Sequence, residues 1–237
     1  MSDPKVNVRR IVVGPLEANC YLVWPGAAGD GPGAGGPRPC LVIDPGAEPE
    51  KILAALEAEQ LRPEVVVATH CHGDHIGAAE AILEAFPEAV WAAGGPEAEW
   101  PGRPAYNLSY AFGFSLQVRP PARLLADGDE VLVGCGLRAA GGGEPQLRFK
   151  VLAVPGHSPG SVALYCEQGK AVFTGDALFA GDIGRADLPG GDEAQLIRSV
   201  RTRLLTLPDE TVVWPGHANR SRVGAEKRSN PYVGQGG

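Results

Sequence analysis

The stretch Thr69-His70-Cys71-His72-Gly73-Asp74-His75 decides the fold that we expect for this chain. It places three histidines and one aspartate, all strong metal ligands, within six consecutive positions. The β-branched run at 65–67 predicts a buried strand before it, and the apolar spacing over 76–83 predicts a helix after it. We therefore expect the cluster to lie on the turn at the end of a strand, where open α/β sheets bind their ligands.

The spacing inside this stretch indicates two ligand groups. In an extended turn, side chains two positions apart point to the same side, so His70 and His72 can converge on one ion. Asp74 and His75 begin a new face and can serve a second ion. Imidazoles and a carboxylate suit zinc, iron or manganese. Cys71 points away from both neighbouring histidines, and we interpret it as a small filler of the core.

Length and composition limit the class of protein. A chain of 237 residues with 44% hydrophobic content is long enough for one buried core, so we expect a single domain over 1–237. The net charge of −7 disfavours a nucleic-acid partner. Five cysteines without a CxxC pair favour reduced thiols. Because the sequence also shows neither a signal core nor a membrane-spanning run, we expect a cytoplasmic protein.

The first half predicts a β-rich opening with strands over 6–13, 19–24 and 40–43. Glycine and proline dominate 25–37, which predicts a mobile loop. After the third strand, Asp44 begins a turn, and apolar spacing predicts a helix over 49–61. Asp44 is either an ordinary turn residue or a carboxylate that orients a metal-bound histidine.

The second half predicts a meander of strands and one long helix. Strands are expected over 131–133, 147–154, 162–165, 171–173 and 211–213, with a glycine turn at 141–143 and an amphipathic helix over 193–207. Five aromatic side chains between the halves either wall a pocket or form a small hydrophobic cluster: Trp100, Tyr106, Tyr110, Phe112 and Phe114.

Three further ligands each follow a predicted strand: His157, Asp176 and His217. With the first stretch they complete a set sufficient for two adjacent metal ions, namely His70, His72, Asp74, His75, His157, Asp176 and His217. The common position after apolar strands favours a shared site over separate structural roles.

The sequence resembles the metallo-β-lactamase fold superfamily through 69–75, 155–161, Gly175-Asp176 and Pro215-Gly216-His217. The segments 184–192 and 226–231 resemble its hydroxyacylglutathione hydrolase, or glyoxalase II-like, branch. This resemblance implies an α/β fold, a four-layer αββα sandwich of two similar halves with the metals at one edge of the sheets.

The resemblance also implies a role for each ligand. His70, His72 and His157 would hold the first metal, and Asp74, His75 and His217 the second. Asp176 would bridge them, and the family uses a water or hydroxide between the ions. Asp74 and Asp176 are the expected catalytic residues. We expect two divalent ions, zinc first, with iron or manganese as alternatives.

The implied activity is hydrolysis of a small-molecule thioester such as S-lactoylglutathione. One alternative is an iron-dependent persulfide dioxygenase, with one iron on His70, His157 and Asp176. Another is hydrolysis of a lactone or other ester. The sequence leaves the oligomeric state open.

The chain departs from a full glyoxalase II near its end. That family carries a helical C-terminal extension with basic contacts to glutathione, and we expect no such extension after Pro231. Four basic residues near His217 are either a substitute patch for an anionic substrate or a solvated basic segment: Arg220, Arg222, Lys227 and Arg228. Arg185 is interpreted as a structural ion-pair residue.

Overall fold

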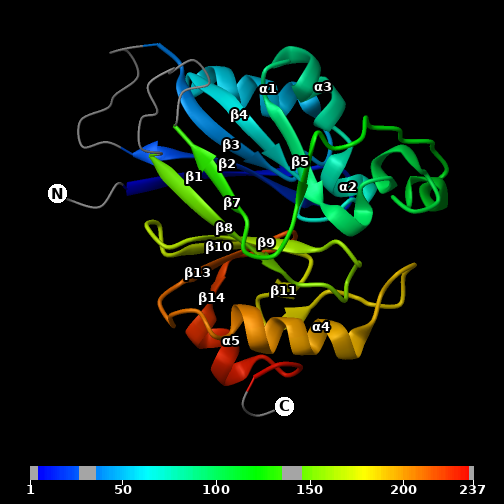
Figure 1. The fold of residues 1–237 in the computed structure, drawn as a ribbon, viewed down its shortest axis with the longest axis vertical. Coiled ribbons are helices and arrows are strands. Elements are labelled where there is room, and N and C mark those ends of the chain that lie inside the picture. The colour runs from blue at the N-terminus through cyan, green and yellow to red at the C-terminus, as the bar shows by residue number, and fades with distance from the viewer. Residues whose placement is uncertain (1–4, 27–35, 135–145, 235–237) are drawn as a thin grey trace.

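Two β-sheets face each other at the centre of the molecule, with helices on both outer sides (Figure 1). The computed structural model describes residues 5–26, 36–134 and 146–234. The first sheet contains β1 (Lys5–Val13), β2 (Ala18–Gly26), β3 (Arg38–Ile43), β4 (Leu61–Val67), β5 (Val90–Gly94) and β6 (Arg123–Leu125), in that order. The second sheet has the order β14 (Ser221–Arg222), β13 (Val212–Pro215), β10 (Ala171–Gly175), β9 (Val162–Cys166), β8 (Leu147–Ala153) and β7 (Glu130–Val133).

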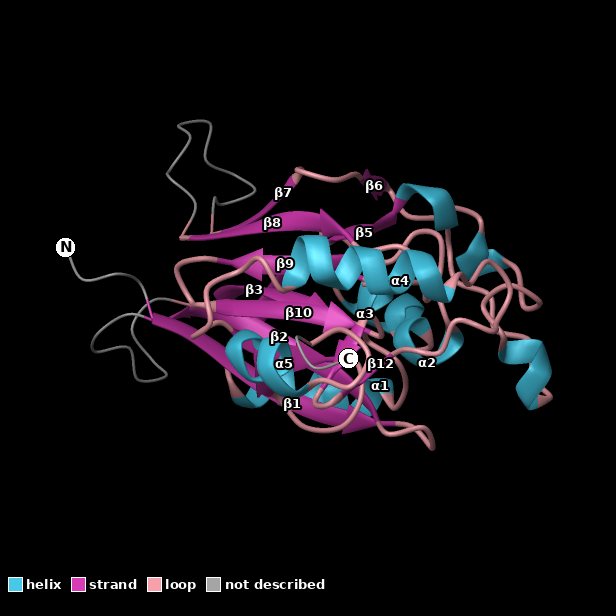
Figure 2. Ribbon diagram, turned by 90° about the horizontal axis from the view of Figure 1, so that it is seen from below, coloured by secondary structure: helices cyan, strands magenta, loops and turns pink. Residues whose placement is uncertain are grey.

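The helices divide between the two outer faces. Above the first sheet lie α1 (Pro49–Ala58) and α3 (Ala79–Ala85), with the short α2 (Gly73–Ile76) before α3. Figure 2 shows α4 (Glu193–Ser199) and α5 (Val223–Ser229) in front of the second sheet. A small ribbon of β11 (Leu178–Phe179) and β12 (Asp182–Ile183) lies between β10 and α4 in the chain. The predicted four-layer αββα sandwich is confirmed.

The burial pattern of the strands explains the layers. Val42 and Val66 pack in the cluster that includes the apolar side of α1 and α3. Their neighbours Leu41 and Val65 pack in a second cluster, between the two sheets. Successive strand side chains point to opposite faces, so the final parts of β3 and β4, residues 40–43 and 65–67, are buried on both faces and are apolar. A third cluster joins the outer face of the second sheet to α4 and α5.

Strand direction brings the ligand-bearing turns to one edge. Strands β3, β4 and β5 are parallel neighbours, and β10 runs parallel to β13. Strand β8 is antiparallel to β9, which is antiparallel to β10, so β8 has the same direction as β10. The carboxyl ends of parallel strands meet at one edge of a sheet, and this edge therefore collects the turns after β3, β4, β8, β10 and β13.

The predicted helix boundaries were wrong in three places. The helix expected over 49–61 ends at Ala58, because Gln60 adopts a positive φ of 50° and β4 begins at Leu61. The helix expected over 193–207 continues beyond Ser199 only as wider π-type turns, Val200–Leu204. The helix expected over 76–83 is divided into α2 and α3.

A close backbone contact explains why α2 stops. A side chain on Gly77 would place its Cβ only 2.3 Å from the carbonyl oxygen of Gly46. The next amide, that of Ala78, donates a hydrogen bond to the Pro45 carbonyl at 2.8 Å. The turn after β3 thus holds the chain between α2 and α3 and interrupts the helical hydrogen bonding.

Two sequence predictions fall partly or wholly outside the described residues. Within the loop predicted over 25–37, Pro25 and Gly26 belong to β2 instead, and 27–35 lie outside them. The glycine turn at 141–143 also lies outside them. Among the helices that the structure does describe, none combines the length and apolar character needed to cross a membrane.

The two halves of the fold are in contact at Gly94, so we expect that adding one methyl group to this residue lowers the stability of the protein. An alanine Cβ at Gly94 would lie 1.9 Å from the Gly160 carbonyl oxygen, whereas one at Gly95 would find no atom nearer than 3.8 Å. We expect Gly94→Ala to lower the free energy of unfolding by about 1–3 kcal/mol, the usual cost of overpacking, and Gly95→Ala to change it little. Denaturant unfolding of both variants measures this, and equal stabilities would contradict the contact.

Candidate metal centre

The structure brings all seven predicted ligands together at the edge where the strands end. His70, His72, Asp74 and His75 follow β4. His157, Asp176 and His217 follow β8, β10 and β13 respectively. Three overlapping groups have ligand atoms within 4.8 Å of one another: His70, His72 and His157; His70, His75 and Asp176; and Asp74, His75 and His217.

The first group is a cluster of three buried imidazoles. The Nε2 atom of His157 lies 3.2 Å from Nε2 of His70 and 3.0 Å from Nδ1 of His72. The ring of Trp100 stacks on His72, with centroids 6.1 Å apart and an angle of 24°. The aromatic wall and the burial of all three histidines give this cluster a dry, rigid setting.

We call Asp74, His75 and His217 the second group, and it combines imidazoles with a carboxylate. Nε2 of His217 lies 3.3 Å from Nε2 of His75 and 3.2 Å from Oδ2 of Asp74. Asp176 stands between the groups, because its Oδ1 is 3.4 Å from Nε2 of His75 and its Oδ2 is 3.7 Å from Nε2 of His157. This position suits a carboxylate that serves both groups.

Backbone carbonyls orient His157 and His217 from behind. Nδ1–H of His157 donates to the Arg185 carbonyl at 2.7 Å, and Nδ1–H of His217 donates to the Leu16 carbonyl at 3.0 Å. Since each Nδ1 carries the donated proton, each Nε2 is directed into the site. The backbone of β2 holds the His217 turn in place, as the Asn19 amide donates to the Gly216 carbonyl at 2.7 Å.

The buried carboxylate of Asp44 orients one histidine from each group. Its Oδ2 accepts from Nδ1–H of His75 at 3.1 Å and from the Thr69 hydroxyl at 2.8 Å, while its Oδ1 accepts from the Thr69 amide at 2.7 Å. Because the Thr69 hydroxyl donates to Asp44, it accepts from Nδ1–H of His70 at 3.2 Å. Of the two roles left open for Asp44, these hydrogen bonds favour the orienting one.

The donor set fits a metal cation. Nε2 of His70 and Nε2 of His157 are both lone pairs, since each Nδ1 donates elsewhere, and they face each other at 3.2 Å. Two acceptors this close repel unless a cation lies between them. Oδ1 of Asp176 is buried and has no hydrogen-bond partner. Such an orphaned oxygen is costly unless a ligand satisfies it.

The two groups differ in how strongly they hold protons. Burial, together with the neighbouring histidines, lowers the pKa of His70 well below its usual range, and burial lowers that of His72 to about 3. Burial would also lower the pKa of His75, but Asp74, Asp176 and Asp44 outweigh it and raise that pKa to about 10. Burial also acts to lower the pKa of His217, but Asp74 and Asp176 outweigh it and raise that pKa. His70 and His72 are therefore neutral and His75 is cationic when no metal competes.

Glu97 is a site residue that the sequence analysis missed. Its buried carboxylate accepts from the Cys71 amide at 2.7 Å and from the Gly160 amide at 2.8 Å. Cys71 and Gly160 belong to the turns that carry His72 and His157, so Glu97 ties the two halves of the first group together. Nothing in its local sequence distinguishes it from an ordinary surface acid.

The other interpretations of single residues have clear outcomes. Cys71 is buried in the core, as expected, and Arg185 forms a two-bond ion pair with Asp187, with both distances 2.7 Å. Lys227 bonds the Leu207 carbonyl and Asp209, and Arg222 bonds the Glu210 carbonyl. These contacts favour a structural role for the two basic residues.

The five aromatic residues divide between both interpretations. Trp100 packs against the core, with the Tyr106 ring centroid 5.6 Å away. Phe112 and Phe114 line a pocket beside Asp74. Tyr110 is 77% exposed.

Comparison with known proteins agrees with this geometry. The model of the metallo-beta-lactamase superfamily matches residues 13–217, and this chain belongs to that superfamily. It is 32% identical over 229 residues to hydroxyacylglutathione hydrolase GloC of Haemophilus influenzae, covering 96% of this chain and 98% of the relative. It is 34% identical over 226 residues to a probable metallo-hydrolase, YqgX, of Bacillus subtilis, covering 95% and 96%.

Solved structures of similar proteins share the fold. BLEG-1, a B3 metallo-beta-lactamase, has a TM-score of 0.83 at 31% identity, covering 96% of this chain and 99% of that one. TTHA1623 in a di-iron-bound form has a TM-score of 0.74 at 38% identity, covering 95% and 100%. ETHE1 from Myxococcus xanthus has a TM-score of 0.70 at 31% identity, covering 96% and 84%. In class, the chain is a superfamily hydrolase with a histidine and aspartate cluster suited to divalent metals.

The hydrogen bonds of Asp44 predict a loss of metal affinity in Asp44→Asn. An amide places N–H groups against the donors of Thr69 or His75, so the histidines lose their fixed orientation. We expect affinity to fall by roughly 10–100-fold, as is usual when the partner behind a ligand is lost. Titration against a chelator measures it. The matched control is Asp209→Asn at an exposed ion pair with Lys227, and equal affinity in both variants would contradict the role of Asp44.

The opposite pKa shifts predict two metal-binding steps with different pH dependence. Metal entering the second group must displace protons from His75 and His217, whose pKa values are raised, so affinity there falls as the pH falls. His70 and His72 are already neutral, so their step changes little between about pH 6 and 8. Calorimetric titration in buffers of different ionisation enthalpy counts the protons released. Equal proton release in both steps would contradict the prediction.

Proposed function

We propose that this protein is a binuclear metal-dependent hydrolase that cleaves small-molecule thioesters of the S-lactoylglutathione kind. The observation that carries the proposal is the pair of three-ligand groups with Asp176 between them. The likeness to a hydroxyacylglutathione hydrolase supports the substrate class.

The proposed ligands follow the two groups. His70, His72 and His157 would hold one ion, Asp74, His75 and His217 would hold the other, and Asp176, which lies between the groups, would serve both. Nitrogen and carboxylate donors suit zinc, and iron is the alternative supported by a similar protein crystallised in a di-iron-bound form. Two such ions, when bound, polarise a carbonyl and lower the pKa of water.

The chain's own residues supply position and hydrogen bonds. Asp74 and Asp176 are the proposed catalytic residues: Asp74 lines the pocket beside the cluster, Asp176 lies between the two groups, and either carboxylate can accept a hydrogen bond from the attacking water. A bond forms between the water oxygen and the carbonyl carbon, the carbon–sulfur bond breaks, and a proton that the water loses passes to the departing thiolate. Cys71 has no part in this, since it is buried in the core and burial raises the pKa of its thiol.

A persulfide dioxygenase is the second candidate, supported by one feature of the geometry. His157 lies 3.2 Å from His70 and 3.7 Å from Asp176, which forms a two-histidine, one-carboxylate set suited to a single iron. Hydrolysis of a lactone or other ester uses the same seven ligands as thioester hydrolysis. It is therefore a variant of the first proposal.

The two candidates differ in which ligands they need. For the hydrolase, the purified protein should contain close to two metals per chain and hydrolyse a thioester. His217→Ala removes a ligand of the second group only, so it should lower thioester turnover on the order of 100-fold or more, because even partners behind a ligand contribute roughly 10–100-fold. Metal analysis and turnover on the same sample measure both quantities.

The same His217→Ala variant distinguishes a dioxygenase from a hydrolase. A single-iron enzyme on His70, His157 and Asp176 should keep its oxygen consumption with glutathione persulfide after His217→Ala. Loss of thioester turnover with two metals in the parent protein supports the hydrolase. Oxygen consumption that survives the substitution, with one iron and no thioester turnover in the parent protein, would replace it with the dioxygenase.

A further inference from the structure

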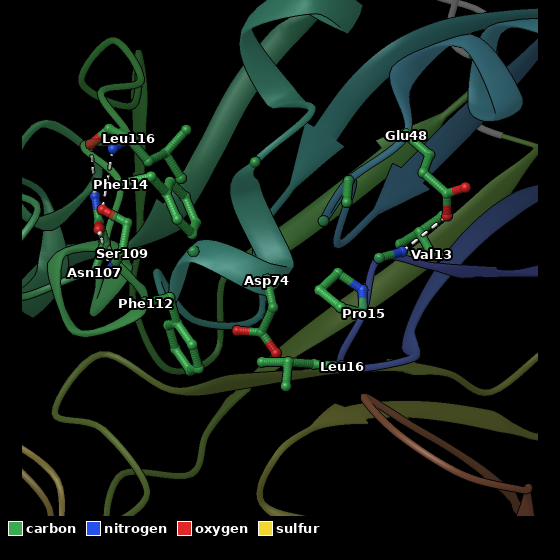
Figure 3. A pocket seen from close by; sticks show the side chains of 15 residues that line it. Val13, Pro15, Leu16, Glu48, Asp74, Asn107, Ser109, Phe112, Phe114 and Leu116 are labelled. Carbon is green, nitrogen blue, oxygen red and sulfur yellow. Dashed lines mark hydrogen bonds between the residues drawn. The ribbon is translucent and has the colours of Figure 1, made fainter.

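A pocket of about 520 Å³ opens directly beside the metal-ligand cluster and shares Asp74 with it (Figure 3). This volume lies in the range of small-molecule sites. One wall comes from the turn between β1 and β2, and the other comes from the segment between β5 and β6. The turn around Gly46 and the helix α2 form the floor. Its lining consists of Val13, Gly14, Pro15, Leu16, Gly46, Ala47, Glu48, Gly73, Asp74, Gly77, Asn107, Ser109, Phe112, Phe114 and Leu116.

The pocket is joined to the reacting centre through Leu16 and Asp74. The backbone carbonyl of Leu16 accepts the hydrogen bond that orients His217, while its side chain lines the pocket. Oδ2 of Asp74 lies 3.2 Å from Nε2 of His217. Figure 3 shows the Asp74 carboxylate between the side chains of Phe112 and Leu16. A group attached to a carbonyl at the metal centre can therefore enter the pocket without a long linker.

The polar groups of the wall are used within the protein. The side-chain amide of Asn107 donates to the carbonyls of Pro101 and Leu116, both at 3.1 Å, and its oxygen accepts from the Ser109 amide at 3.0 Å. The Ser109 hydroxyl accepts from the Leu116 amide at 3.0 Å. These bonds shape the segment that presents Phe112 and leave an apolar face toward the pocket.

The charges in the lining are negative. Glu48 and Asp74 are its only titratable side chains among the described residues, and both are acidic. Glu48 accepts from the Gly14 amide at 2.8 Å and lies 3.5 Å from the ammonium of Lys51. Arg10 bonds the Ala218 carbonyl, Arg220 stacks on Trp214, and neither lines the pocket. An anionic group would gain no partner in this pocket and would meet two carboxylates.

A thioester has two arms, and the pocket distinguishes them. A soluble thiol carrier such as glutathione bears carboxylates, which need cationic partners. An alkyl acyl arm needs only apolar surface. We propose that the pocket bounded by Leu16, Phe112 and Phe114 binds the acyl arm and makes the enzyme prefer medium-length alkyl acyl groups to the small, hydroxylated lactoyl group. This inference rests on the proposed thioester hydrolysis and specifies its substrate class.

An acyl series on one carrier tests the preference. The metal-loaded protein is assayed with acetyl, butyryl, hexanoyl and D-lactoyl thioesters of N-acetylcysteamine, and kcat/KM is measured for each. A hydrophobic pocket discriminates by about tenfold or more for each methylene group that it binds. We therefore expect kcat/KM to rise at least about tenfold from the acetyl to the hexanoyl thioester, and the value for the lactoyl thioester to lie near that for acetyl. A second series, acetyl thioesters of alkanethiols of increasing length, should stay flat.

Two aromatic residues of one helical turn provide a matched pair of variants. Phe112 lines the pocket, whereas Tyr110 is exposed and does not line it. Phe112→Ala should lower kcat/KM for the hexanoyl thioester about tenfold and leave the acetyl thioester within about twofold. Tyr110→Ala should change neither value. Since Phe112 is 60% exposed, its loss leaves the core intact.

The outcomes are distinguishable. A kcat/KM that is constant across the acyl series, or an equal loss for both substrates in Phe112→Ala, would overturn the inference that the pocket binds the acyl arm. Either result would still agree with the proposed thioester hydrolysis. A rise with the alkanethiol series alone would assign the pocket to the thiol arm and also overturn the inference. If protein with two metals hydrolyses no member of either series, the proposed function fails and the inference falls with it.

Discussion

The geometry of the candidate metal centre depends on one buried carboxylate. Asp44 bonds the Thr69 amide, the Thr69 hydroxyl and His75, and through Thr69 it also orients His70. The backbone of Asp44 has a positive φ of 52°, a conformation that Asp tolerates better than most residues. Because His70 belongs to the first ligand group and His75 to the second, the Asp44 side chain orients one histidine in each group. The strained turn after β3 is therefore part of the site's construction.

Glu97 makes the corresponding connection between the two sheets. Its two oxygens bond amides in the turns after β4 and β8, which belong to different sheets. Gly94 and Gly160 touch in the same region, so backbone from both halves is in direct contact there. A site assembled from two sheets requires such connections, because a shift of about 1 Å between ligands is enough to impair catalysis.

The two ligand groups have different electrostatic surroundings. The first group consists of buried imidazoles, with Trp100 stacked on His72, whereas His75 in the second group is close to the carboxylates of Asp44, Asp74 and Asp176. Asp74 also borders the apolar pocket beneath Phe112 and Leu16. The same carboxylate thus adjoins the metal ligands and the space available to a substrate. In our proposal, reactivity and substrate choice meet at this residue.

The sequence alone identified the candidate ligand residues and the general architecture. Histidines and aspartates directly after apolar strands are local patterns, and short continuous apolar runs identify buried strands such as β3 and β4 without tertiary information. Helix ends were predicted less well, since Gln60 adopts a positive φ that the apolar spacing does not reveal and Gly77 lies against the distant turn at Gly46.

Only the tertiary structure decided the roles of Asp44, Glu97, Leu16 and Phe112. Asp44 and His75 are 31 positions apart, and Leu16 and His217 are 201 apart. Glu97 has the local sequence of a surface acid, and Leu16 contributes its backbone carbonyl, which every residue carries. Ligand identity is a property of the side chain and is visible in the sequence. Orientation, by contrast, results from contacts between segments that only the folded chain brings together.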